Sequence, residues 1–392
     1  MKKLILLIPV IFFLTGCYNY RELNDLAIIS GVAVSKNNDT YNITVEVVNP
    51  KKEQDTSSGK EPDYVIYEGT GKSMQEAFRT IVKESPQKLY GAQIDVLIID
   101  EETAREGIDD ILDFFARDPE VRSEFYVVIS KNDETLKIIS PLVNLSSKNI
   151  VNSLKSTNTY MGFVNLVTYH ELLSNFINPH IEIALPSIEM VGNEEVGQNT
   201  ENIETTTSEA NNIISNMTVF KDGKMLGYLT EEESLGYNII MNNSKTVLIR
   251  NEYDIGDFIV NEIIDSSTEV LPNIKDKEIT INIKGEASIA EVNYDINLES
   301  DKDIKKIEKE FNDNIEKLVL NTIDNTNNKY NSDIYGFKDL FYKKNPKKYK
   351  KLIKELGDNF LNELNIKVKS NIKIIEKGNL NGGIVDEQRE SK

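Results

Sequence analysis

The stretch Tyr41-Asn42-Ile43-Thr44-Val45-Glu46-Val47-Val48-Asn49 alternates apolar and polar side chains over most of its length. A period of two residues is typical of a β-strand with one buried face. The turn-forming residues Lys36-Asn37-Asn38-Asp39 stand just before it and follow the largely apolar run 27–35. We therefore predict two strands, over 27–35 and 41–49, joined by this turn.

Short strands and helices alternate beyond this pair. Residues 101–117 place apolar side chains at positions 108, 111, 112 and 115, which is the spacing of one helix face. The predicted elements are a strand at 64–67, a helix at 74–84, a strand at 94–99, a helix at 101–117, a strand at 125–129 and a helix at 134–139. This order predicts an α/β region with a mixed sheet.

The segment Gly69-Thr70-Gly71-Lys72-Ser73 resembles part of a nucleotide-binding P-loop. A P-loop needs a glycine five residues before the second glycine, and Ile66 stands there, so we reject that interpretation. Ser73 and Glu76 instead have the spacing of a capping box at a helix start. We expect the two glycines to permit a tight turn from strand to helix.

The two histidines of the chain, His170 and His180, flank a helix predicted over 168–176. The pattern is weak before that helix, through 144–161, and a strand is predicted after it at 181–185. A zinc site on a helix would place its histidines about one turn apart, and these stand ten residues apart. We expect surface or capping histidines and identify no metal or cofactor ligands.

Residues 191–212 are acidic and polar, have no aromatic side chain and cannot bury apolar surface. We interpret them as a linker at a domain boundary or as one long exposed loop. The chain then divides into an N-terminal α/β region at 17–190, with a candidate split into two subdomains near 140–160, and a C-terminal α+β domain at 213–378. Residues 379–392 are expected to form a disordered tail.

The C-terminal region begins with a hairpin, because Asp222-Gly223 is a strong signal for a two-residue turn. Thr230 and Glu233 have the spacing of a second capping box. Further predicted elements are strands at 247–250, 258–270, 278–298 and 366–375, and helices at 304–322 and 346–364. The fold class is therefore mixed α/β and α+β, with mixed sheets flanked by helices and neither Rossmann nor TIM-barrel architecture.

The N-terminus has the order of an export signal, with Lys2 and Lys3, the apolar run 4–14 and then Leu14-Thr15-Gly16-Cys17. Eleven residues are too few to span a bilayer, which needs roughly 17–25. The last four residues match a bacterial lipobox, although an ordinary secretory signal peptide remains an alternative. A lipobox implies that residues 1–16 are removed and that Cys17, the only cysteine, receives diacylglycerol.

The composition limits the partners and the chemistry. The formal net charge is −19, and losing Lys2 and Lys3 lowers it to −21, so nucleic acid is not expected to bind. We find neither a Gly-x-Ser-x-Gly nor a His-Glu-x-x-His motif. A hydrolase that uses two carboxylates stays open, because such residues need not be close in sequence. The residues disfavour an enzyme.

Several segments together resemble one family. Tyr18-Asn19-Tyr20-Arg21-Glu22-Leu23 is similar to the start of the Ger(x)C lipoproteins, the C subunits of spore germination receptors, although that family shows Trp-Asp before Arg-Glu-Leu. The hairpin 219–229 matches as well. Asp333-Ile334-Tyr335-Gly336-Phe337 is similar to a family motif in which a glycine replaces Lys338. The resemblance covers nearly the whole chain after Cys17.

This resemblance implies a non-enzymatic subunit of a nutrient germinant receptor. It implies integral-membrane A and B subunits as partners and a bilayer anchor through acylated Cys17. The expected location is the outer face of the spore inner membrane. No catalytic or cofactor-binding residues come with the family. The alternative is a solute-binding lipoprotein of a transporter, which would have two doubly wound lobes.

One charge cluster stays without an assigned role. Seven lysines stand within twelve positions of an acidic chain: Lys343, Lys344, Lys347, Lys348, Lys350, Lys351 and Lys354. They form either a solvated helix face or a contact with anionic lipid or an acidic partner loop.

Overall fold

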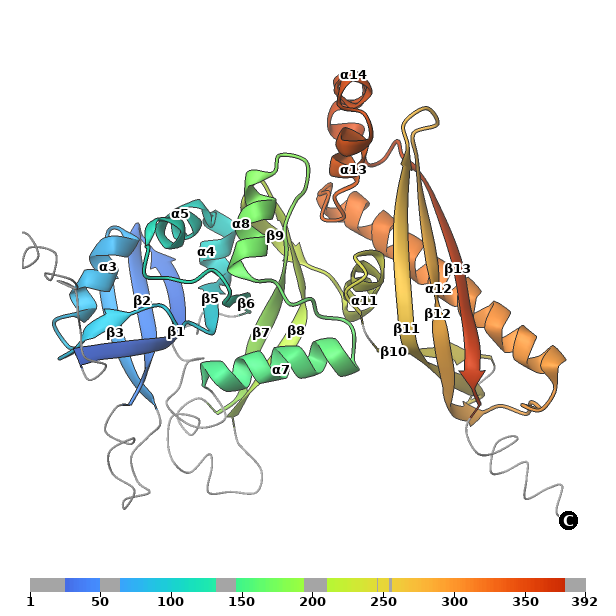
Figure 1. Cartoon of the computed structure of the whole chain (residues 1–392), viewed down its shortest axis with the longest axis horizontal. Helices are drawn as coiled ribbons and strands as arrows, with labels where there is room; N and C mark the ends of the chain where they lie inside the picture. The colour runs from blue at the N-terminus through green and yellow to red at the C-terminus, as the bar shows by residue number, and fades with distance from the viewer. Residues whose placement is uncertain are drawn as a thin grey trace, which may run out of the picture.

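The computed structural model describes residues 25–49, 64–131, 146–193, 210–244, 246–253 and 256–377. Figure 1 shows two sheets placed one after the other along the long axis, with helices packed on them. Strand β1 (Leu26–Asn37) pairs antiparallel with β2 (Thr40–Val48), as the alternating pattern predicts. These two strands form the start of the first sheet.

The first sheet contains nine strands among the described residues, in the order β3-β2-β1-β5-β6-β7-β8-β9, with β4 also paired to β1. Strands β1, β5, β6 and β7 run parallel, and the other pairs on this path are antiparallel. The remaining strands are β3 (Tyr64–Gly71), β4 (Lys88–Tyr90), β5 (Val96–Asp100), β6 (Tyr126–Ser130), β7 (Ala184–Gly192), β8 (Ala210–Lys221) and β9 (Lys224–Tyr228). The sheet is therefore mixed.

Helices cover both faces of this sheet. One face packs against α3 (Met74–Ile81), α4 (Glu101–Glu106), α5 (Asp109–Arg117) and α8 (Tyr169–Ile177), and the other packs against α7 (Ser147–Tyr160). In β5, Leu97 and Ile99 face the first group of helices, while Val96 and Ile98 face α7. Burial on both faces explains why β5 is a continuous apolar run without alternation.

The second sheet has the order β10-β11-β12-β13, with the last pair parallel. Its strands are β10 (Val247–Glu252), β11 (Phe258–Asn273), β12 (Glu278–Asn293) and β13 (Asn365–Glu376). Helix α12 (Asp301–Tyr330) lies against one face of this sheet and also contacts α11 (Glu231–Ile240). Helices α13 (Phe337–Lys344) and α14 (Pro346–Leu356) and the 3₁₀ turn η2 (Gly357–Asn359) then lead into β13.

The predicted fold class is confirmed, because both sheets are mixed, helices flank them and neither closes into a barrel over the described residues. Two local predictions also hold. Asp222 and Gly223 both have positive φ, 49° and 76°, at the turn between β8 and β9. Thr230 and Glu233 form both hydrogen bonds of a capping box at the start of α11.

The helix predictions need correction in three places. Residues 101–117 form two helices, α4 and α5, because Gly107 has φ 138° and ends the first. Residues 144–161, which lacked a clear pattern, contain α7 over fourteen residues. The helix predicted over 346–364 ends at Leu356, and α13, which the sequence reasoning missed, precedes it.

Two predictions about strands also need correction. Gly69 and Gly71 lie inside β3, so their role is to let α3 pack directly on the strand. A Cβ atom at Gly69 would stand 2.2 Å from the carbonyl oxygen of Ala77. The strand predicted over 181–185 begins at Ala184 and continues through Pro186, where the register with β8 shifts at a bulge that tolerates proline.

The acidic stretch 191–212 joins two strands that pair with each other. Strands β7 and β8 run antiparallel from Gly192 opposite Ala210 to Ala184 opposite Val219. This pairing favours the loop over the linker, while the division into domains remains a prediction. The signal peptide 1–16, Cys17, the helix at 134–139 and the tail 379–392 lie outside the described residues. No described helix has the length and apolar character needed to cross a bilayer.

Candidate functional site

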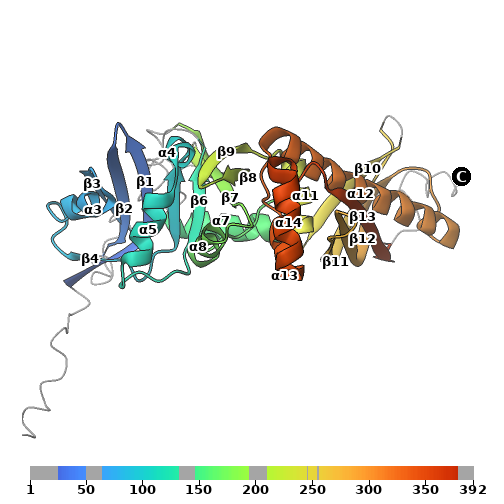
Figure 2. The same cartoon turned by 90° about the horizontal axis from the view of Figure 1, so that it is seen from above.

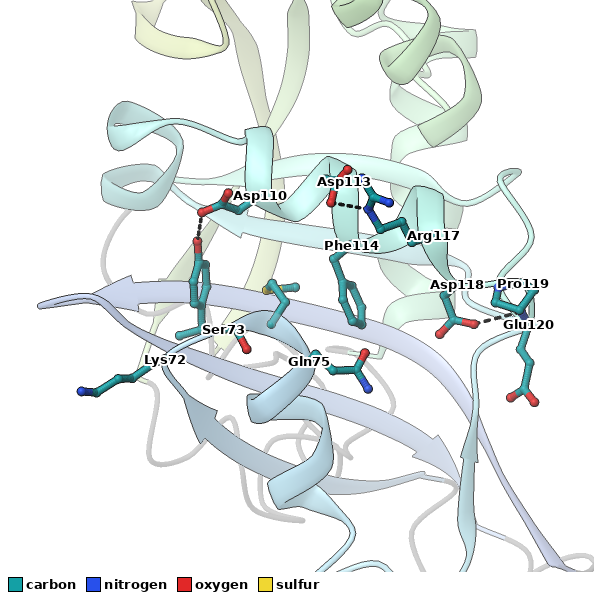
Figure 3. A pocket seen from close by; sticks show the side chains of 12 residues that line it. Lys72, Ser73, Gln75, Asp110, Asp113, Phe114, Arg117, Asp118, Pro119 and Glu120 are labelled. Atoms are coloured by element: carbon teal, nitrogen blue, oxygen red, sulfur yellow. Dashed lines mark hydrogen bonds and ion pairs between the residues drawn. The ribbon is translucent and has the colours of Figure 1, made fainter.

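A groove of about 650 Å³ lies between the start of α3 and the length of α5. In Figure 3, Phe114 projects from α5 toward the first turn of α3, where Gln75 lies. Phe114 and Met74 are apolar residues of its lining, and the Phe114 ring stacks on that of Phe78 with centroids 4.9 Å apart. Helix α3 holds its position because two glycines of β3 let it approach the strand closely.

Charged and hydroxyl groups line the rim of this groove. The Tyr41 hydroxyl donates a hydrogen bond of 2.7 Å to the Asp110 carboxylate, and burial together with this contact raises the pKa of Tyr41. Asp113 and Arg117 form an ion pair of 2.7 Å one helical turn apart. The Arg117 guanidinium holds the pKa of the Asp113 carboxyl below its usual range. The rim is therefore polar and largely self-paired.

The groove lacks a nucleophile activated by a base among its described lining residues. The Ser73 hydroxyl accepts a hydrogen bond from the Glu76 N–H at the start of α3 and so acts as a helix cap. In an ideal capping box the Glu76 carboxylate would accept a hydrogen bond from the N–H of the N-cap residue, Ser73. Here it accepts one from the N–H of Lys72, the preceding residue. Both groups are therefore engaged in capping α3.

A second candidate region is the junction between the two sheets. The Asp333 carboxylate accepts hydrogen bonds from the N–H groups of Phe337 at 2.9 Å and Lys338 at 2.7 Å, which caps α13. The Asp333 carbonyl accepts from the Glu182 N–H at 3.0 Å, and the Ser332 hydroxyl donates to the Phe220 carbonyl at 2.5 Å. Burial raises the pKa of the Asp333 carboxyl to about 6, although the N–H groups of Phe337 and Lys338 favour its charged form.

His180 also lies at this junction. Its ring centroid is 4.3 Å from that of Tyr342, and its Nδ1 is 3.2 Å from the Tyr349 hydroxyl oxygen. Burial lowers the pKa of His180. His170 instead lines a pocket beside α8. No cluster of three or more metal-binding side chains occurs in the described part of the chain.

Sequence reasoning proposed one site residue, Cys17, and this residue lies outside the described part of the chain. The groove and the junction were not predicted, because each combines segments that are distant in sequence. Asp333 did stand in a motif that resembles the Ger(x)C family. That motif was the available signal for the junction, although its structural role became clear only from the hydrogen bonds around it.

Comparisons with known proteins agree on one family. Residues 19–190 match the family described as the spore germination protein N-terminal domain, and residues 215–378 match the spore germination B3/GerAC-like C-terminal family. The second match begins inside β8, so the later part of β8 and all of β9 belong to the C-terminal family region although they complete the first sheet.

Individual relatives are similar over nearly their whole lengths. Spore germination protein KC of Bacillus subtilis (strain 168) is 28% identical over 97% of this chain and 96% of its own length. Spore germination protein B3 of the same strain is 22% identical over 94% and 97%, respectively. The crystal structure of the GerBC protein superposes with a TM-score of 0.50 at 18% identity, over 88% of this chain and 97% of that one, and shows the shared fold. The chain therefore belongs to the GerAC-like, or Ger(x)C, family of spore germination proteins.

Proposed function

We propose that this chain is the lipid-anchored, non-enzymatic C subunit of a nutrient germinant receptor. It acts with integral-membrane A and B subunits at the outer face of the spore inner membrane. The observation that carries the proposal is the match of both family regions, in order, over most of the chain. The lipobox ending in Cys17 supplies the attachment to the bilayer.

The non-enzymatic role rests on the two regions described above. The groove between α3 and α5 is lined by paired charges and a helix cap, and the junction at Asp333 holds two bodies together. Both arrangements suit a protein that binds and positions partners. The order of the first sheet and the largely antiparallel second sheet also differ from the two doubly wound lobes expected of a solute-binding lipoprotein.

Acylation would act through effective concentration, because two proteins tethered to one surface meet almost as if they were linked. Such tethering raises avidity by roughly 10²–10⁴ without any new contact. Cys17→Ala, as the only copy in spores, should therefore give a folded protein and a poor response to the nutrient that this receptor serves. Germination by a trigger that bypasses nutrient receptors should stay normal.

Asn19→Ala is the matched control, because it lies beside the lipobox and leaves Cys17 in place. Its spores should respond normally to the nutrient. A full nutrient response from spores whose Cys17→Ala protein is verified as unacylated would show that the anchor is dispensable. Failure with both kinds of trigger would indicate a general defect of the envelope and count against a receptor subunit.

A further inference from the structure

Helices α13 and α14 carry a dense patch of positive charge at the surface. We define the lysine patch as seven side chains, all of them exposed: Lys343, Lys344, Lys347, Lys348, Lys350, Lys351 and Lys354. Lys343 forms an ion pair with Asp339 at 2.6 Å. Over the described residues, the other six have no acidic side chain within 4 Å.

Part of this arrangement costs α14 stability, at its first turn and wherever two lysines stand one turn apart. Lys347 and Lys348 lie in the first turn of α14, which contains no acidic residue, although a helix N-terminus favours negative charge. Lys347 and Lys351, and likewise Lys350 and Lys354, stand four residues apart on the same helix, where like charges repel. An ordinary solvated face would mix both signs of charge. The uncompensated patch indicates a partner that supplies negative charge.

The first turns of α12 show the contrast within the same chain. Lys302, Lys305 and Lys309 are also exposed, with the same spacing as Lys347, Lys350 and Lys354. Acidic residues are interleaved with them, at positions 301, 303, 308 and 310. The two sets of three lysines therefore have the same spacing but differ in the number of acidic residues beside them.

The patch stands on a well-packed support. Tyr349 and Leu352 of α14 and Phe341 of α13 are buried, and the rings of Phe341 and Phe360 meet edge to face with centroids 5.6 Å apart. The inner faces of both helices are therefore packed on the hydrophobic core that the second sheet shares with α12, and the lysines lie on the exposed side. A rigid charged surface loses little conformational freedom on binding.

The start of the first strand and one end of the helix pair that carries the patch can face the same membrane surface. Figure 2 shows the start of β1, beside β4, and the α13 end of the helix pair on the same lower edge of the molecule. Eight residues separate Cys17 from Leu26, a chain length that reaches up to roughly 30 Å when extended. The net charge of −21 that follows the loss of Lys2 and Lys3 makes an anionic surface repel most of the protein and attract this patch, which orients the molecule.

We propose that the lysine patch is a second membrane contact, which binds the headgroups of anionic phospholipids and lays the long axis of the protein along the bilayer. The proposal rests on the proposed function in that the anchor at Cys17 brings the protein to the membrane. Lysine near an anionic bilayer strengthens binding by roughly five-fold per residue, and salt weakens this attraction.

The test uses the chain from residue 17 with Cys17→Ser, so that no acyl group contributes. Sedimentation with vesicles of phosphatidylglycerol and phosphatidylcholine should show binding that weakens with salt, and vesicles of phosphatidylcholine alone should bind much less. Lys347→Glu, Lys350→Glu and Lys354→Glu combined should weaken binding about a hundred-fold or more. Lys302→Glu, Lys305→Glu and Lys309→Glu combined change the net charge equally and should weaken it far less.

Three outcomes would overturn the proposal. The first is no binding of the C17S chain to anionic vesicles. The second is equal loss of binding in both triple variants, which would show a response to net charge alone. The third is absent vesicle binding together with loss of nutrient response in spores that carry the α14 triple variant, which would identify an acidic protein as the partner. A thermal unfolding scan of each variant confirms that it is folded.

The result is separable from the proposed function. Vesicle binding by the C17S chain does not depend on acylation or on the A and B subunits. Suppose that spores with Cys17→Ala respond normally while the purified chain binds anionic vesicles through α14. The proposed role of the anchor is then contradicted, and the proposed lipid contact is supported. If the anchor proves necessary and no vesicle binding occurs, the lipid contact fails alone.

Discussion

The backbone N–H of Glu182 donates a hydrogen bond of 3.0 Å to the carbonyl oxygen of Asp333, and this contact joins the two halves of the protein. The same aspartate caps α13 through its side chain. Nearby, the Tyr330 hydroxyl donates to the Tyr228 carbonyl at 2.7 Å. The two halves are thus tied by one hydrogen bond between backbone groups and by the Tyr330 and Ser332 hydroxyls, which donate to backbone carbonyls of the first half.

The stability of this junction should depend on the protonation of Asp333. Its pKa in the folded protein is about 6, above the ordinary 3.8, because burial disfavours the charged form. The folded state therefore binds more protons between these values, and the contribution of Asp333 to stability falls as pH rises from about 4 through 6.

Asp333→Asn removes this titration. Urea unfolding of both proteins from pH 4 to pH 7 should show that the stability advantage of the native chain over Asp333→Asn is largest near pH 4 and declines toward neutral pH. An advantage that grows with pH would mean that the N–H donors of Phe337 and Lys338 outweigh burial.

Gly69 should not tolerate a side chain. Gly69→Ala would place a Cβ atom 2.2 Å from the Ala77 carbonyl oxygen and 2.5 Å from the Ile81 side chain, so α3 must move away from β3. We expect the free energy of unfolding to fall by at least about 1–3 kcal/mol, measured by urea denaturation.

Gly91→Ala is the control for this change, because its nearest neighbour is a Val121 methyl carbon at 2.9 Å, on a side chain that can rotate. It should lower the free energy of unfolding by clearly less. An equal decrease in the free energy of unfolding in the two variants would contradict the view that close packing of α3 on β3 excludes a side chain at residue 69.

Cleavage within 194–209 should not release separate halves. The composition predicts that this stretch is protease-sensitive. Strands β7 and β8 pair on either side of it, and β8 carries Met217 and Val219 into the core that α11 and α12 share. Limited proteolysis should therefore give two fragments on a denaturing gel and one species on native size exclusion. Two separated folded species on size exclusion would support a linker between independent domains.

The sequence by itself determined the features that depend on a few neighbouring residues. Asp222-Gly223 specifies a turn because both residues adopt positive φ at low cost, and Thr230 with Glu233 specifies a helix start because the partners are three residues apart. Alternation in β2 predicted a single buried face, but Thr44 and Glu46 on its polar face are buried as well, under α7. The apolar stripe of α12 did report its buried face directly. The family resemblance likewise came from local motifs.

Only the tertiary structure decided the rest, because those features depend on contacts between distant segments. The break between α4 and α5 occurs where the Ile108 N–H donates to the Gly223 carbonyl at 3.1 Å, more than a hundred residues along the chain. Helix α7 is polar over much of its length and gains its stability by burying Ile150 and Leu154 on the first sheet. The groove, the junction at Asp333 and the exposure of all seven lysines follow from such packing, which no short stretch of sequence encodes.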